Sequence, residues 1–202
     1  MVLDPITLGG AVLVLIDFQM AFDAPPWSGR WNIDLDANAV SLLLAFRSAG
    51  LPVVHVRHDS IDEGSTLRRG ERGNAFRPGL QPLATEQVVS KSVNAAFIGT
   101  DLDLRLRRLG FGTLIVCGIS TDMCVSTSVR VGANLGWDIV LVEDACESFD
   151  IPDRKGGVIP AALVHEVHLA TLAHEFCRVV DTGSVLQAVT RWRASASASV
   201  TS

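Results

Sequence analysis

Short, uniformly apolar segments alternate along this chain with longer segments whose apolar residues recur at helical spacing. The apolar segments span residues 11–16, 52–56, 87–91, 113–117, 137–142 and 177–180. The helical segments between them span residues 35–49, 101–109, 121–135 and 159–175. Strands without polar alternation are typical of a parallel sheet that helices cover on both faces. The sequence therefore predicts an α/β protein of three layers, α/β/α, doubly wound around a mainly parallel six-stranded sheet.

Two segments interrupt this alternation and bound the expected domain. Residues 59–84 form a long polar stretch, and loops of that length inside a domain are usually functional or mobile. From about residue 191 the chain becomes a low-complexity run of Ala and Ser. We therefore expect one domain over residues 1–190, followed by a flexible tail over residues 191–202. A chain of 202 residues, 48% of them hydrophobic, can bury a full core without disulfides or metals.

Charge and composition exclude several classes of partner. The formal net charge is -5, whereas nucleic-acid binding needs clustered excess Lys and Arg. Residues 1–5 lack the basic start of a secretory signal, and the apolar run 11–16 is far too short to span a bilayer. We therefore expect no nucleic-acid or membrane partner. A cytoplasmic location would keep the four cysteines as free thiols.

Three polar residues stand where predicted strands end. Asp17 follows the first strand, Lys91 ends the third, and Cys124 lies just beyond the fourth. The carboxyl ends of parallel strands meet at one edge of the sheet, so these side chains should converge in one crevice. Alone, each has an ordinary structural explanation: a strand-end cap, a surface lysine and a small buried side chain. Only their joint pattern points to chemistry.

Cys124 is the best candidate nucleophile among the four cysteines. It falls in the first turn of a predicted helix, where unpaired N–H groups and the helix dipole favour a thiolate. We expect Lys91 to lower the thiol pKa further and Asp17 to accept the thiol proton. The other cysteines, Cys117, Cys146 and Cys177, are interpreted as structural.

Four segments together resemble the isochorismatase-like cysteine hydrolase superfamily. They are V-L-I-D-F-Q at 14–19, Lys91 with A-F-I-G-T at 96–100, V-C-G-I-S-T-D-M-C-V at 116–125, and V-E-D-A at 142–145. The resemblance extends over about residues 10–182. It implies a Rossmann-like fold and a homodimer or homotetramer. The G-x-G-x-x-G and P-loop motifs are absent, so the fold pattern itself gives no reason to expect a nucleotide cofactor.

The resemblance also implies roles for individual residues. Asp17, Lys91 and Cys124 match the family's catalytic triad, and the Ile119–Ser120 bond matches a non-proline cis peptide. That bond would turn the N–H of Ser120 toward the crevice, where it would form an oxyanion hole with the N–H of Cys124. The implied enzyme is a metal-independent cysteine amidohydrolase that cleaves an amide or ureido C–N bond of a small molecule through a thioester.

Three alternatives stay open at this point. In an isochorismatase-type vinyl-ether hydrolase, Asp17 would protonate the substrate and the cysteine would be dispensable. A nicotinamidase would carry Asp-x-His and further histidines after the second strand, but residues 55–60 read H-V-R-H-D-S. We therefore expect no bound metal and no other cofactor. A binding module whose thiol is oxidised rather than acylated is the third alternative.

Residues near the predicted crevice are candidates for binding the substrate. They are Phe18, Gln19, Phe22, Trp27, Arg57, His58, Asn74, Phe76 and Ile119. Aromatic side chains there could pack on a flat apolar molecule. Phe18 could equally belong to the core, and Trp27 to an oligomer interface. For Arg57 we favour a structural ion pair, and for His58 a place in the crevice wall rather than metal ligation.

Overall fold

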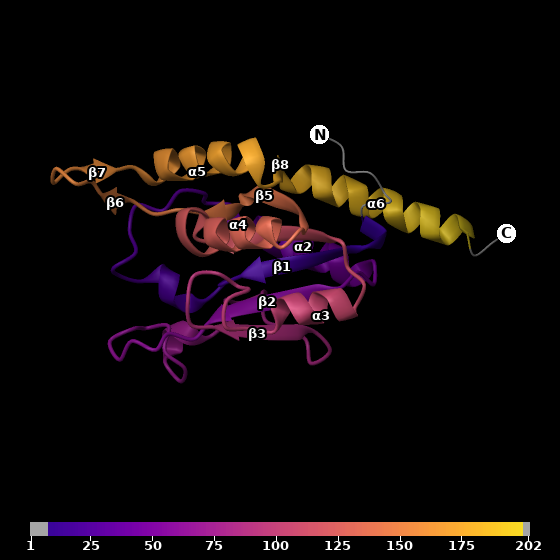
Figure 1. The fold of residues 1–202 in the computed structure, drawn as a ribbon, viewed down its shortest axis with the longest axis horizontal. Coiled ribbons are helices and arrows are strands. Elements are labelled where there is room, and N and C mark those ends of the chain that lie inside the picture. Colours follow the sequence, from indigo (N-terminus) through magenta and orange to yellow (C-terminus); the bar gives the residue numbers. More distant parts are fainter. Residues whose placement is uncertain (1–7, 200–202) are drawn as a thin grey trace.

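A six-stranded parallel sheet forms the centre of the molecule, as the computed structural model of residues 8–199 shows (Figure 1). Its strands are β1 (Ala11–Ile16), β2 (Val53–His58), β3 (Gln87–Lys91), β4 (Thr113–Ile119), β5 (Asp138–Glu147) and β8 (Arg178–Val180). They lie in the order β3-β2-β1-β4-β5-β8, and every neighbouring pair is parallel. The predicted fold class is therefore confirmed. A separate antiparallel hairpin consists of β6 (Ile151–Pro152) and β7 (Val158–Ile159).

Helices flank this sheet. They are α2 (Leu35–Ser48), α3 (Leu102–Arg108), α4 (Ser126–Asn134), α5 (Ala161–Glu175) and α6 (Thr182–Ser199). Helices α2 and α6 pack on each other and against β5, whereas α4 packs on α5 and on β5. All residues of β1 and β4 are buried, which explains why the sequence shows them as unbroken apolar runs. Within residues 8–199 no helix is long and apolar enough to cross a lipid bilayer.

The C-terminal segment differs from its prediction. Helix α6 runs through Ser199, so the expected domain boundary at residue 190 falls inside a helix (Figure 1). Alternating Ala and Ser looked like a frayed end, but Ala is the best helix former and the run contains no Gly or Pro that would stop a helix. Residues 1–7 and 200–202, which the expected domain and tail include, lie outside the described residues.

The long segment between β2 and β3 is fixed to the rest of the domain. Its Arg77 side chain is 1% exposed and donates to Asp36 and to Asp23, both at 2.7 Å. Leu80 is fully buried in the core, and a short 3-10 helix, η2 (Arg72–Asn74), lies in the same segment. A buried arginine with two carboxylate partners anchors this loop beside the segment that follows β1.

Gly118, near the end of β4, lets this strand run close beside β1. Its φ is +152°, and a Cβ there would lie 2.3 Å from the backbone oxygen of Ile16. Neither strand can shift to make room without also moving Asp17, which directly follows β1. The close approach therefore requires a residue without a side chain.

We predict that Gly118→Ala lowers the free energy of unfolding by about 2 kcal/mol or more, because the new methyl group overlaps the backbone of β1. Urea unfolding followed by circular dichroism measures the change. Gly112→Ala is the matched control, since a Cβ at Gly112 meets nothing within 4 Å. Equal stability of the two variants would contradict this explanation of the glycine.

Candidate active site

The Lys91 ammonium lies among three acceptors at the carboxyl edge of the sheet. Its Nζ is 2.5 Å from Oδ2 of Asp17, 3.1 Å from Nδ1 of His58 and 3.2 Å from Sγ of Cys124. The side chains of Lys91 and Asp17 are fully buried. The three residues that the sequence pattern brought together are thus in direct contact through one amine.

Asp17 occupies the bend where β1 ends, with a backbone φ of +55°. Burial raises the pKa of its carboxyl, and the charge and hydrogen bond of Lys91 act in the opposite direction. Its second oxygen, Oδ1, is buried and has no hydrogen-bond partner among the described residues. A buried carboxylate with a raised pKa and a free oxygen is a stronger base than an exposed one.

The pKa of the Cys124 thiol is raised, whereas the sequence predicted that it would be lowered. It lies in a short π-helical turn, η3 (Thr121–Val125), that leads into α4, and the residue is 8% exposed. The pKa of this thiol is raised to about 12, mainly by burial and also by the nearby Asp17, and Lys91 only partly compensates. The expected lowering by Lys91 and the helix start is outweighed by desolvation, so the resting group is a neutral thiol.

The thiol opens into a pocket of about 180 Å³. Its walls are formed by Phe22, Trp27, His58, Leu67, Asn94, Ser120, Met123 and Cys124. The rings of Phe22 and Trp27 are 5.0 Å apart, and Trp27 is also 5.0 Å from Phe149. This aromatic wall makes the pocket small and mostly apolar. The Ile119–Ser120 peptide beside it is cis.

Some predicted binding residues line this pocket, and others support it from behind. Phe22, Trp27 and His58 are in the wall. Gln19 is fully buried, and its amide donates to the backbone oxygens of His58 and Asn74, both at 3.0 Å. Asn74 in turn donates to the same oxygen of His58 at 3.0 Å. The two amides therefore tie the ends of β1 and β2 to the long loop, away from the pocket wall.

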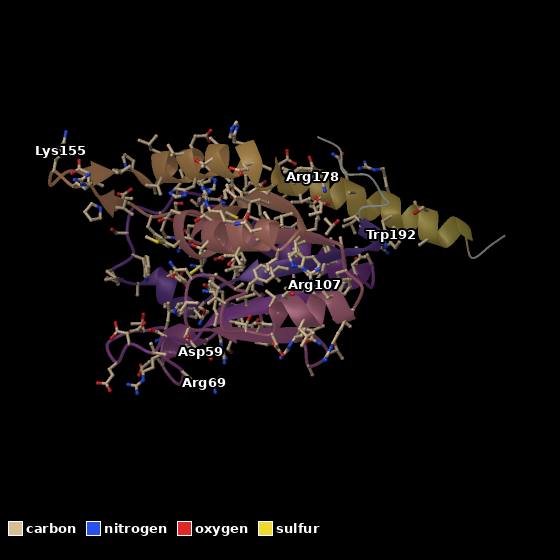
Figure 2. All side chains as sticks on the ribbon, in the orientation of Figure 1. Asp59, Arg69, Arg107, Lys155, Arg178 and Trp192 are labelled. Carbon is tan, nitrogen blue, oxygen red and sulfur yellow. The ribbon has the colours of Figure 1, made fainter. Side chains whose placement is uncertain are left out.

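The remaining candidates also lie outside the wall. Phe18 and Ile119 are buried in the core, and Phe76 packs edge-on against His55. Arg57 forms the ion pair that we favoured, with its Nε 2.9 Å from Asp59. Asp59 also pairs with Arg69 at 3.0 Å, on the loop beside β3 (Figure 2).

Three wall residues were not among the sequence candidates: Leu67, Asn94 and Met123. Leu67 comes from the long loop, whose path has no periodic signal. Asn94 stands three residues after Lys91, and Met123 directly precedes Cys124. Asn94 and Met123 could have been predicted from their proximity in sequence to Lys91 and Cys124.

The same cluster contains groups that could ligate a metal. Single ligand atoms of Asp17, His58 and Cys124 lie within 4.8 Å of one another. The Lys91 ammonium, however, already contacts all three, so a cation occupies the centre of this set. The other histidine of β2, His55, is buried and contacts Glu86 at 2.9 Å, away from the cluster.

Comparison with known proteins gives one consistent result. A family model described as "Isochorismatase domain" matches residues 11–184. The solved structure of an isochorismatase-family protein from Chromobacterium violaceum is 41% identical, has a TM-score of 0.87, and covers 90% of this chain and 94% of its own. A cysteine hydrolase from Pseudomonas syringae is 27% identical, with a TM-score of 0.85 and coverage of 95% and 98%. A ureidoacrylate amidohydrolase from Agrobacterium fabrum is 32% identical over 59% of this chain and 52% of its own.

Asp17 and Lys91 act in opposite directions on the Cys124 thiol, which gives a test by substitution. We predict that Asp17→Asn lowers the pKa of Cys124, because it removes a negative charge, and that Lys91→Met raises it. The rate of iodoacetamide alkylation against pH, followed by peptide mass spectrometry, reports this pKa. At a fixed pH below this pKa, the alkylation rate changes by about tenfold for each unit by which the pKa shifts. The half-buried Cys177 is the internal control, and shifts in the same direction for both variants would contradict the assignment.

Proposed function

The chain belongs to the isochorismatase family of hydrolases, and we propose that it is a cysteine amidohydrolase that cleaves the C–N bond of a small amide or ureido compound. The observation that carries the proposal is the contact of Lys91 with both Asp17 and Cys124 at the base of a pocket. Nucleophile, base and cation are the parts that acyl transfer through sulfur requires. The proposal needs no metal ion, because the ammonium supplies the positive charge.

The first half-reaction begins with a neutral thiol. Asp17 accepts the proton of Cys124 as the sulfur attacks the substrate carbonyl, and Lys91 stabilises the charge on both groups. The backbone N–H groups of Ser120 and Cys124 donate to the oxyanion. The C–N bond then breaks, the proton on Asp17 passes to the leaving nitrogen, and ammonia or an amine departs. The acyl group remains on sulfur as a thioester.

The second half-reaction returns the enzyme to its starting state. A water molecule gives a proton to Asp17 and attacks the thioester carbonyl, with the same N–H groups holding the oxyanion. The C–S bond breaks, the acid leaves, and the proton on Asp17 returns to the sulfur of Cys124. Asp17 thus serves as base and acid in turn, for which a pKa raised toward the working pH is favourable.

The comparisons support this class of reaction rather than a particular substrate. One neighbour in structure is described as a cysteine hydrolase, and one relative as a ureidoacrylate amidohydrolase. A vinyl-ether hydrolase would have no use for a thiol that contacts the same ammonium as the base. Assembly as a homodimer or homotetramer stays a prediction.

We predict that Cys124→Ala and Cys124→Ser each reduce amide hydrolysis by about 10⁴-fold or more, because no acyl group can transfer to sulfur. Ammonia release is measured over carboxamides, ureido acids and biuret, with and without added Zn²⁺. Intact-protein mass spectrometry should show an acyl adduct on the chain that retains Cys124 and none on either Cys124 variant. Cys177→Ser is the matched control and should retain both signals.

Full activity of the Cys124 variants would contradict the proposal. Activity that persists in them and is insensitive to iodoacetamide would favour vinyl-ether chemistry at Asp17. Sulfenic and sulfinic forms of Cys124 without any acyl adduct would favour a redox module.

A further inference from the structure

His58 joins the buried triad to the pocket. One ring nitrogen, Nδ1, is 3.1 Å from the Lys91 ammonium, and the ring forms part of the pocket wall beside Cys124. The ring therefore has one edge on the cation, and the residue also lines the pocket to which the thiol opens. No catalytic step proposed above uses this residue.

The contact with Lys91 determines which ring nitrogen carries the proton. An ammonium has three N–H donors and no lone pair, so each of its neighbours must accept. Asp17 and Cys124 take two of these donors, and Nδ1 of His58 takes the third. Because Nδ1 accepts, the proton of the neutral ring is on Nε2. Burial and the charge of Lys91 both lower the pKa of His58, which disfavours a second proton.

The ring is also held in place from its backbone. The His58 N–H donates to Oε1 of Gln19 at 2.8 Å, and its C=O accepts from Gln19 and Asn74, both at 3.0 Å. Nε2 makes no hydrogen bond to any residue between 8 and 199. It is also not among the buried polar atoms that lack a partner. It is thus a fixed donor without a protein acceptor.

We propose that the Nε2–H of His58 is a specificity determinant, which selects uncharged amides that carry a second hydrogen-bond acceptor beside the scissile carbonyl. This inference rests on the proposed amidohydrolase function. The other wall residues have no charge: Phe22, Trp27, Leu67 and Met123 are apolar, and Asn94 and Ser120 are neutral. A carboxylate on the substrate would find no free cation there, because Lys91 is already paired with Asp17. A neutral carbonyl oxygen or aromatic nitrogen fits this donor.

Benzamide and the three pyridinecarboxamides test the proposal, because they share one shape and differ only in the presence and position of a ring nitrogen. We expect kcat/KM for at least one pyridinecarboxamide to exceed that for benzamide by about 3- to 10-fold, the effect of one neutral hydrogen bond. Isophthalamic acid, the carboxylate-bearing analogue, should show no such gain.

Two substitutions of His58 test the roles of Nδ1 and Nε2 separately. The amide of His58→Asn can take the place of Nδ1 toward Lys91 but cannot reach as far as Nε2, so the acceptor preference should disappear. The longer amide of His58→Gln can donate from the position of Nε2, so the preference should persist. His174→Asn, at an exposed position of α5, is the control and should leave the ratio unchanged.

The tautomer has a readout that needs no substrate. Nitrogen NMR of the imidazole should show an unprotonated Nδ1 and a protonated Nε2 for the ring that is missing in His58→Asn. A protonated Nδ1, or a preference that survives in His58→Asn, would overturn the proposal. No turnover of the four aromatic amides, combined with acyl-Cys124 from another amide, would overturn this substrate class and leave the amidohydrolase standing. Absence of any acyl adduct would overturn both.

Discussion

A single buried ammonium organises the candidate active site of this molecule. Lys91 contacts a carboxylate, an imidazole and a thiol, and it brings together the ends of β1, β2 and β3 with the turn that follows β4. A charge in such a place is costly unless it is paired and hydrogen-bonded, and here every N–H of the amine has an acceptor. The requirement to satisfy this amine therefore determines where Asp17, His58 and Cys124 can lie.

The same burial sets the protonation states. Desolvation disfavours the thiolate of Cys124 and the carboxylate of Asp17 alike, and Lys91 offsets the effect at both. The resting site thus keeps its proton on sulfur beside a strengthened base. We infer that the nucleophile forms only as Asp17 removes the proton during attack. A thiol in this state is also protected from oxidation while no substrate is bound.

The sequence predicted the convergence of the three candidate catalytic residues better than it predicted the pocket wall around them. Asp17, Lys91 and Cys124 could be grouped because polar residues at the ends of parallel strands meet at one edge of the sheet. The raised pKa of the Cys124 thiol could not be predicted from the sequence, because the burial of this residue depends on packing by distant segments. Gln19 and Asn74 looked like substrate contacts, because an amide in a loop carries no sign of whether it faces backbone or solvent. Leu67 was missed for a related reason: the long loop returns to the pocket through ion pairs of Arg77 that no local pattern shows.

The central claim is that one acyl-sulfur intermediate stands between substrate and product. Partitioning with hydroxylamine tests it most directly, in a series of substrates that share an acyl group and differ in the leaving amine. If the acyl group rests on Cys124, hydroxylamine and water compete for the same thioester. The ratio of hydroxamate to acid will then be the same across the series. A ratio that changes with the leaving amine would contradict a common intermediate, and with it the catalytic role of the thiol.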